Sequence, residues 1–211
     1  IVLITKGLYA QSNQSKTLIW ADEFNIDGAP DATKWAYDLG TGDWGWGNNE
    51  AQYYTNRADN VKVLDGKLII TPKKESYQGS NYTSARIKTQ GKFSFKYGKV
   101  EIRAKQPSGG GVWPALWMLG DNKGEINWPA CGEIDIMELT GDKPTRIIGT
   151  AHFGANLSQH QFRTGAAFLS SGTFSDAFHV FSIIWEKDKI KWLLDGVQYF
   201  EITPDKLNGQ P

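Results

Sequence analysis

Residues 132–139, Gly-Glu-Ile-Asp-Ile-Met-Glu-Leu, place three acidic side chains inside an otherwise apolar segment. The segment is short for a helix, and in a strand Glu133 and Asp135 share one face while the isoleucines share the other. Strict alternation would put Glu138 on the apolar face, where an unpaired carboxylate is costly. One extra residue, accommodated as a β-bulge around 136–137, would return Glu138 to the acidic face.

Three carboxyl groups on one face, the outer two flanking a single sugar ring, are the arrangement that a retaining glycosidase needs. Its nucleophile and its general acid/base lie about 5–5.5 Å apart across the scissile bond. Acids that alternate with isoleucines also occur on half-buried surface strands, and neighbouring acids can bind calcium. The motif alone therefore leaves catalysis, a surface strand and a metal site open.

A second motif, Gly-Gly-Gly-Val-Trp-Pro-Ala-Leu-Trp-Met-Leu, occupies residues 109–119. Together the two segments resemble the core of glycoside hydrolase family 16, and within it the laminarinase-type endo-β-1,3-glucanases. The acidic motif of that family has an optional extra residue, and the longer version is present here. The resemblance covers about residues 18–205, and further matches occur in the family's order at 21–24, 48–50, 84–87, 97–103 and 150–153.

The resemblance implies an all-β, concanavalin A-like β-sandwich (jelly roll) of two antiparallel sheets with a concave substrate cleft. It implies endo-acting cleavage of laminarin-like β-1,3-glucan by a retaining double displacement, which activity on mixed-linkage 1,3-1,4-β-glucan can accompany. Glu133 would be the nucleophile and Glu138 the general acid/base, with Asp135 sharing a proton with Glu133. Since one glutamate must be ionised and the other protonated, we expect their pKa values to be pushed apart.

Aromatic residues near the acids are candidates for sugar binding, because flat rings stack on the apolar faces of pyranoses. If residues 112–119 form a strand with Leu116 in the core, Trp113 and Trp117 point to the acidic side. Trp128 is expected in a loop next to the acidic strand. The alternative for Trp113 and Trp117 is packing between two sheets.

Other candidates rest on the resemblance. Asn49 and Arg86 match positions that hydrogen-bond sugar hydroxyls, although strand arginines often pair with acids instead. His152 is expected on a neighbouring strand near Glu138 or Asp135, either in a catalytic part or as a hydrogen-bonded histidine without one. No cofactor is required; a structural calcium is implied at the backbone carbonyls of Glu23 and Gly66.

Alternating apolar and polar residues predict strands along most of the chain. Two segments, 61–70 and 189–200, each carry a central Asp-Gly, which is the strongest short signal for a hairpin. Residues 100–105 and 178–185 also have strand character, and no window has a convincing helical period. Many short strands with glycine-rich turns predict a β-sandwich in one domain.

The composition limits the possible partners. The 211 residues carry 23 basic and 23 acidic side chains, so charge favours neither nucleic acid nor an acidic membrane. A neutral polysaccharide is the expected partner, and we expect a monomer. The sequence has no apolar stretch of the length needed for a membrane span. The single Cys131 is expected to be buried and inert.

Residues 1–15 are expected to be the remnant of a secretory signal peptide or a disordered leader, which implies a secreted, extracellular or periplasmic protein. Residues 16–211 would be the catalytic domain, truncated at its C-terminus because its last residues have loop composition. The alternative function is a catalytically silent, lectin-like β-glucan-binding module on the same sandwich. The complete set of three acids favours the enzyme, because binding alone needs no acid pair.

Overall fold

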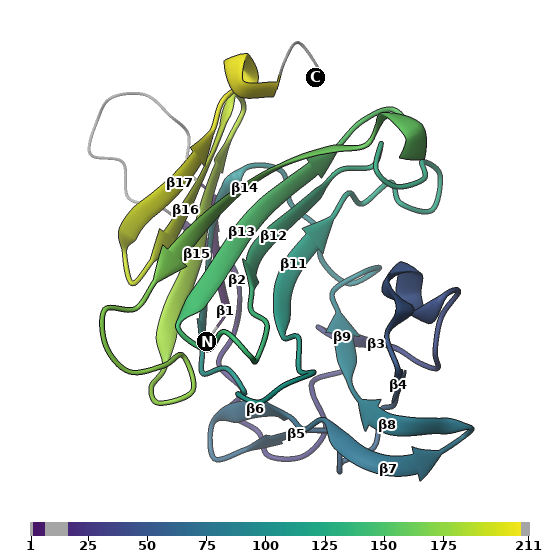
Figure 1. Cartoon of the computed structure of the whole chain (residues 1–211). Helices are drawn as coiled ribbons and strands as arrows, with labels where there is room; N and C mark the ends of the chain where they lie inside the picture. The colour runs from purple at the N-terminus through teal and green to yellow at the C-terminus, as the bar shows by residue number, and fades with distance from the viewer. Residues whose placement is uncertain (1, 7–16, 208–211) are drawn as a thin grey trace. The chain divides into compact units, whose positions relative to one another are not determined.

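The computed structural model describes residues 2–6 and 17–207, and its regular secondary structure is almost entirely β-strand (Figure 1). It divides into two compact units. One unit comprises residues 1–21 and 96–211, and the other comprises residues 22–95. Within the described residues, no helix is long and apolar enough to cross a membrane.

The first unit contains two antiparallel sheets. The larger has the order β17-β16-β15-β10-β1-β2 and is formed by β1 (Val2–Lys6), β2 (Thr17–Asp22), β10 (Gly98–Ala104), β15 (His179–Glu186), β16 (Lys189–Leu194) and β17 (Val197–Ile202). The smaller has the order β11-β12-β13-β14 and is formed by β11 (Ala115–Leu119), β12 (Glu133–Glu138), β13 (Arg146–Phe153) and β14 (Gln161–Phe168). Short 3₁₀ turns occupy Leu157–Gln159 (η2) and Pro204–Leu207 (η3).

The two sheets of this unit pack face to face. Trp192 on β16 is fully buried, and its indole Nε1 donates a 2.8 Å hydrogen bond to the backbone oxygen of Asp135 on β12. Gly149 and Gly165 make room for the larger sheet, because a Cβ at either position would lie 2.3 Å from a ring atom of Trp192 or Phe200, respectively. Close packing through an apolar interior confirms the predicted β-sandwich.

The second unit contains three small sheets. These pair β3 (Ala36–Asp38) with β9 (Arg86–Lys88), β5 (Val61–Leu64) with β6 (Lys67–Ile70), and β8 (Ser80–Ser84) with both β4 (Gln52–Tyr54) and β7 (Lys73–Tyr77). A short helical segment, η1, spans Gly45–Asn49. The pair β4–β8 is parallel, unlike the antiparallel pairs of the two larger sheets.

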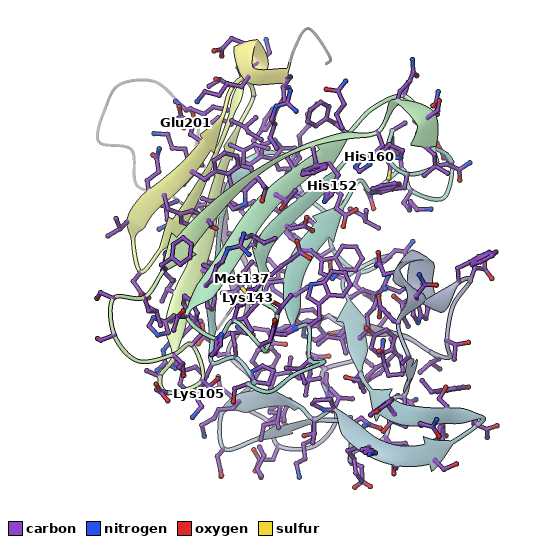
Figure 2. The ribbon with its side chains drawn as sticks, in the orientation of Figure 1. Lys105, Met137, Lys143, His152, His160 and Glu201 are labelled. Atoms are coloured by element: carbon purple, nitrogen blue, oxygen red, sulfur yellow. The ribbon has the colours of Figure 1, made fainter. Side chains whose placement is uncertain are left out.

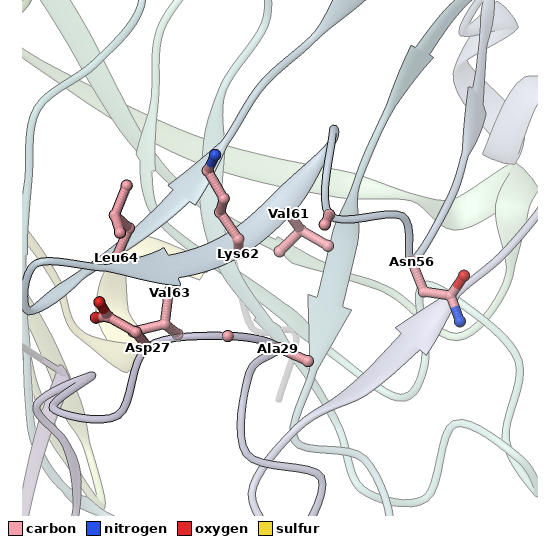
Figure 3. Close-up of a pocket in the computed structure, with 9 residues that line it drawn as sticks. Asp27, Ala29, Asn56, Val61, Lys62, Val63 and Leu64 are labelled. Carbon is pink, nitrogen blue, oxygen red and sulfur yellow. The ribbon is translucent and has the colours of Figure 1, made fainter.

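A cavity of about 340 Å³ lies within this second unit, beside β5 (Figure 3). Its lining is mostly apolar, with Asp27 and Lys62 as its charged residues, and is formed by residues 27–29, 56, 58 and 61–64. None of the residues predicted for substrate binding or catalysis lines it.

Both predicted hairpins are confirmed. Residues Asp65 and Gly66 have φ values of 51° and 70° between β5 and β6, and Asp195 and Gly196 have values of 49° and 82° between β16 and β17. Positive φ at both central residues is the requirement of a type I′ turn, and the Asp-Gly pair meets it. The strands predicted at 100–105 and 178–185 are β10 and β15.

The strand predicted at 112–119 is shorter than expected and begins at Ala115. Pro114 has no N–H to donate to a neighbouring strand, so regular pairing starts after it. Its carbonyl oxygen still accepts a hydrogen bond from Leu139 N at 3.2 Å. Trp113 therefore lies in the preceding loop rather than on the strand.

Within the predicted leader, Val2–Lys6 forms β1 and pairs with β10, while residues 1 and 7–15 lie outside the described part of the chain. The leader and the boundaries of the predicted domain stay predictions. Cys131 is buried, as expected.

Candidate active site

The register of β12 confirms the predicted bulge. Asp135 pairs with Thr150 on β13 and Glu138 pairs with Ile148, so three steps along β12 correspond to two along β13. The extra residue lies within Ile136–Met137, whose side chains are 2% and 0% exposed. Cross-strand partners share a face, so the bulge returns Glu138 to the face that carries Glu133 and Asp135.

Each acid of this face has a partner that can donate a hydrogen bond. Trp128 Nε1 donates to Glu133 Oε2 at 2.5 Å, and Trp113 Nε1 donates to Glu138 Oε1 at 3.0 Å.

The central acid, Asp135, is only 3% exposed, and its Oδ2 lies 3.2 Å from Nε2 of His152. Trp117 is its cross-strand neighbour on β11. The structure therefore brings Trp113, Trp117, Trp128 and His152 to the acidic face, as the sequence predicted.

The pKa values of the two outer acids are both raised. Burial, followed by the charge of Asp135, raises the pKa of Glu133 from 4.5 to about 7, and the same two causes raise that of Glu138 to about 7. The expectation that these pKa values are pushed apart is wrong for this structure. Both carboxyls are buried to a similar degree beside the same aspartate, so neither is singled out by solvation.

Local contacts nevertheless distinguish the two. Glu133 accepts the shorter indole hydrogen bond and lies directly opposite His152 across the β12–β13 pair. Charge-assisted hydrogen bonds and a facing cation both favour a carboxylate over a carboxylic acid. A hydrogen bond between Glu133 and Asp135 also links their protonation. These contacts favour Glu133 as the ionised member of the outer pair.

The raised pKa values predict that the stability of the folded state decreases as the pH rises. Protonation of Glu133 and Glu138 stabilises the folded state, so this contribution is complete below about pH 4.5 and is lost as the pH rises to about 7. Glutamine at both positions cannot ionise, so the double variant should lose less stability over this range. We expect the melting temperature of the double variant minus that of the unsubstituted chain to increase from pH 5 to pH 8, as measured by circular dichroism.

The control for this experiment is Glu125→Gln, which replaces an exposed carboxyl. Its melting temperature should follow that of the unsubstituted chain at every pH. A double Glu133→Gln/Glu138→Gln variant whose melting curve has the same pH dependence as this control would contradict the assigned pKa shifts.

One residue of the site was missed by sequence reasoning. His160, which directly follows η2, has its Nε2 2.9 Å from Nδ1 of His152. Its ring also contacts Trp128, with centroids 4.5 Å apart, and Phe162, with centroids 6.0 Å apart. No sequence signal links two histidines eight positions apart in a strand and a turn, so only the chain reversal between β13 and β14 reveals the pair.

The remaining predicted sugar-binding residues lie in the second unit. Arg86 donates from Nε to Asp38 Oδ2 at 2.8 Å, and its guanidinium lies over the ring of Trp46, 4.6 Å from the centroid. Asn49 ends η1 with a φ of 55°, and its backbone N donates to Trp44 O at 3.0 Å. Arg86 thus pairs with an acid, which was the alternative to sugar binding for this residue. Sugar binding by Arg86 and Asn49 stays a prediction.

Glu50 organises a polar group next to these residues. Its carboxylate accepts hydrogen bonds from Tyr54 Oη at 2.7 Å and from Gln52 Nε2 at 2.5 Å. Burial, followed by these contacts with Glu50, raises the pKa of Tyr54 far above its ordinary value. Tyr54 therefore stays protonated and acts as a hydrogen-bond donor.

The implied calcium site would use backbone carbonyls of the same unit. Gly66 occupies the β5–β6 turn, and Glu23 follows β2. In the described part of the chain, no group of three or more histidine, cysteine, aspartate or glutamate side chains could hold a metal ion. Calcium binding at these carbonyl oxygens stays a prediction.

Three carboxyl groups on one bulged strand, framed by indole rings, are the arrangement expected of a carbohydrate-cleaving hydrolase of the two-carboxylate type. The chain belongs to the glycosyl hydrolases family 16, whose family model matches residues 48–211.

Individual members of the family are similar to this chain over most of its length. The chain is 45% identical over 193 residues to the β-glucanase of Rhodothermus marinus, covering 90% of this chain and 66% of that protein. It is 44% identical over 200 residues to glucan endo-1,3-beta-glucosidase A1 of Niallia circulans, covering 88% of this chain and 29% of that protein. It thus spans only part of the curated relatives it matches. The solved laminarinase catalytic domain of Thermotoga maritima has a TM-score of 0.82 at 45% identity, covering 91% of this chain and 79% of that one.

Proposed function

We propose that this protein is an endo-β-1,3-glucanase that cleaves laminarin-like glucan with retention of anomeric configuration. The observation that carries the proposal is the bulge in β12, which puts Glu133, Asp135 and Glu138 on one face. Burial raises the pKa values of Glu133 and Glu138 to about 7. Such shifts are typical of catalytic acids and are not expected of carboxyls on an ordinary surface strand. The names of the similar proteins support β-1,3-glucan as the substrate.

The proposed reaction has two displacements. In the first, a carboxylate oxygen of Glu133 attacks the anomeric carbon while the proton of Glu138 passes to the leaving oxygen, so a glycosyl ester forms as the glycosidic bond breaks. In the second, Glu138 takes a proton from water, the water oxygen attacks the same carbon, and Glu133 leaves as a carboxylate. Asp135 takes up or returns the proton that it shares with Glu133 as the charge of Glu133 changes.

Substrate binding in this proposal depends on stacking and hydrogen bonds rather than on charge. The chain has equal numbers of basic and acidic side chains, and a β-glucan is neutral. The indoles of Trp113, Trp117 and Trp128 supply flat faces near the acids. Hydrogen bonding of sugar hydroxyls by Asn49 and Arg86 is also part of the proposal.

We also propose secretion, which suits an enzyme whose substrate is an external polysaccharide. A structural calcium at the carbonyls of Glu23 and Gly66 is part of the proposal, and it takes no part in the two displacements.

Hydrolysis of a soluble laminarin, followed from the first minutes by proton NMR, tests the proposal. We expect new reducing ends, of which the β-anomer appears first and converts to the equilibrium mixture later, because two successive inversions give retention. Early appearance of the α-anomer would contradict the nucleophilic role of Glu133, since a single displacement inverts the centre. Incubation with a 1,4-linked glucan is the matched control for linkage and should yield few products.

Glucan binding without hydrolysis is the second candidate. It predicts that the protein is retained on an insoluble β-1,3-glucan while no reducing ends form at any pH between 5 and 8. That result would reject the glucanase proposal and would assign the aromatic residues near the acids to glucan binding alone.

A further inference from the structure

Two histidines lie in a row beside the three carboxyls, with His152 next to Asp135 and His160 beyond it. His152 comes from β13 and His160 from the turn that precedes β14, and Figure 2 shows their labels close together near the end of the four-stranded sheet. Their rings are nearly parallel, with centroids 5.1 Å apart and planes inclined by 20°. Together with Asp135 they form a continuous chain of contacts, 3.2 Å from Asp135 Oδ2 to His152 Nε2 and 2.9 Å from His152 Nδ1 to His160 Nε2.

The position of His160 is fixed from several sides. Asn156 caps η2, since its side-chain oxygen accepts a hydrogen bond from Gln159 N at 3.2 Å. The backbone N of His160 then donates to Leu157 O at 3.3 Å. The imidazole lies against the indole of Trp128, which also donates to Glu133. The histidine is therefore held in place by the same tryptophan that contacts the proposed nucleophile.

The contacts restrict where protons can lie. If Asp135 is a carboxylate, His152 donates to it from Nε2, and a neutral His152 then accepts at Nδ1 from His160. If His152 is a cation, its Nδ1 also carries a proton, and Nε2 of His160 must accept. In either state one proton lies between the two rings, so both histidines cannot be cations in this geometry.

The surrounding charges also favour a single positive charge on the histidine pair. Burial alone lowers the pKa of His152, but its hydrogen bond to Asp135 and the charges of Asp135, Glu133 and Glu138 outweigh burial and raise it. Burial, and then the charge of His152, lowers the pKa of His160. Asp135, Glu133 and Glu138 act on His152 from one side and His160 contacts it from the other, while His152 is the charged group that acts on His160. The positive charge of the pair therefore resides on His152.

We infer that His160 is a positioning residue for the reaction: as the acceptor for Nδ1 of His152, it keeps His152 oriented and charged toward Asp135 and Glu133. The inference rests on the proposed function for its effect on turnover, but not for the histidine pair itself. A charged His152 favours the ionised form of the proposed nucleophile. Loss of the acceptor should make His152 easier to deprotonate and Glu133 harder to ionise.

The test compares His160→Phe with His160→Gln. Phenylalanine keeps an aromatic ring against Trp128 but has no acceptor, whereas the side-chain oxygen of glutamine can still accept from His152. In His160→Phe we expect the pKa of His152 to fall by about 0.5–1 pH unit. The acidic limb of kcat/KM against pH should move upward, with a loss of about 3- to 10-fold in kcat/KM at pH 6. His160→Gln should restore both quantities most of the way.

The direct measurement is a pH titration by nitrogen-15 NMR of the full chain labelled in histidine. The chain contains three histidines, so single substitutions suffice to assign every signal. In the unsubstituted protein, His152 should titrate above and His160 below the ordinary histidine range, whether or not laminarin is cleaved. Independent titration of the two rings near their ordinary pKa would overturn the inference even if His160→Phe does not fold.

The outcomes separate the two proposals. Unchanged titration of His152 and an unchanged pH profile in a folded His160→Phe would reject the positioning role while leaving the glucanase proposal intact. A uniform loss of activity at all pH values, with a lowered melting temperature and no shift of the profile, would show a structural role only and would also reject it. Shared titration without any glucan cleavage would retain the histidine pair and reject the proposed function.

Discussion

Glutamine in place of Glu133 or Glu138 is expected to reduce laminarin hydrolysis by about 10²–10⁴-fold or more, while binding of a laminarin oligosaccharide is retained. Glutamine has almost the same shape as glutamate, but it can neither attack the anomeric carbon nor transfer the catalytic proton. Both positions lie in a half-buried site where loss of a charge relieves a desolvation cost, so the fold should persist. Initial rates and calorimetric binding on the same preparations provide the measurement.

The matched control is Glu125→Gln, because Glu125 is an exposed acid outside the bulged strand. It should retain the activity of the unsubstituted chain. If either active-site variant turns over laminarin at the unsubstituted rate, the role assigned to that residue is wrong. If both variants lose binding as well as turnover, the two acids hold the substrate rather than act on its bond.

Azide distinguishes the two roles, because it is a small nucleophile that needs no general base. In Glu133→Ala it can occupy the space of the missing carboxylate and, in a single displacement, give a glycosyl azide of inverted configuration. In Glu138→Ala, a substrate with a good leaving group still forms the ester on Glu133, and azide then gives the retained product. The opposite pattern would exchange the roles of Glu133 and Glu138.

Replacement of Trp192 with alanine is expected to have the largest effect on stability. The side chain is completely buried between the two sheets, and loss of a large core aromatic costs about 3–5 kcal/mol. A typical domain is stable by only about 5–15 kcal/mol, so the melting temperature should fall by on the order of 10 °C or folding should fail. Thermal unfolding followed by circular dichroism measures the effect.

Trp192→Phe isolates the hydrogen bond from the packing. It keeps most of the ring but removes the N–H that donates to the backbone oxygen of Asp135 at 2.8 Å, and an unsatisfied buried carbonyl costs about 1–3 kcal/mol. Since this bond supports β12 directly before the bulge, turnover should fall as well. Trp44→Ala is the control, because Trp44 is 86% exposed and its loss should change stability by less than about 0.5 kcal/mol. Equal melting temperatures for Trp192→Phe and the unsubstituted chain would show that this hydrogen bond does not stabilise the strand.

Much of the fold follows from local sequence. The two Asp-Gly turns predicted their hairpins because few other dipeptides tolerate positive φ at both positions. Pro114 marked an irregularity correctly, yet the strand begins at Ala115, one residue after it. The two antiparallel sheets were expected from the family resemblance, but their strand order and the three small sheets could not be predicted, because strand order depends on contacts between distant segments.

The acidic side of β12 was determined by the sequence itself. Alternation with isoleucine placed Glu133 and Asp135 together, and the cost of burying Glu138 alone on the apolar face predicted the bulge that the register shows. The expectation of separated pKa values failed because pKa depends on burial and on neighbouring charges, and those depend on the folded environment.

Only the tertiary structure decided which groups complete the site. The hydrogen bonds of Trp113 and Trp128 to the acids, the support of Asp135 by Trp192 from the other sheet, and the pairing of His152 with His160 all join residues from different elements. A sequence determines the period and the turns of each strand because these are local properties of the backbone. Which side chains then meet is determined by the packing of sheet against sheet and loop against strand, which no single segment encodes.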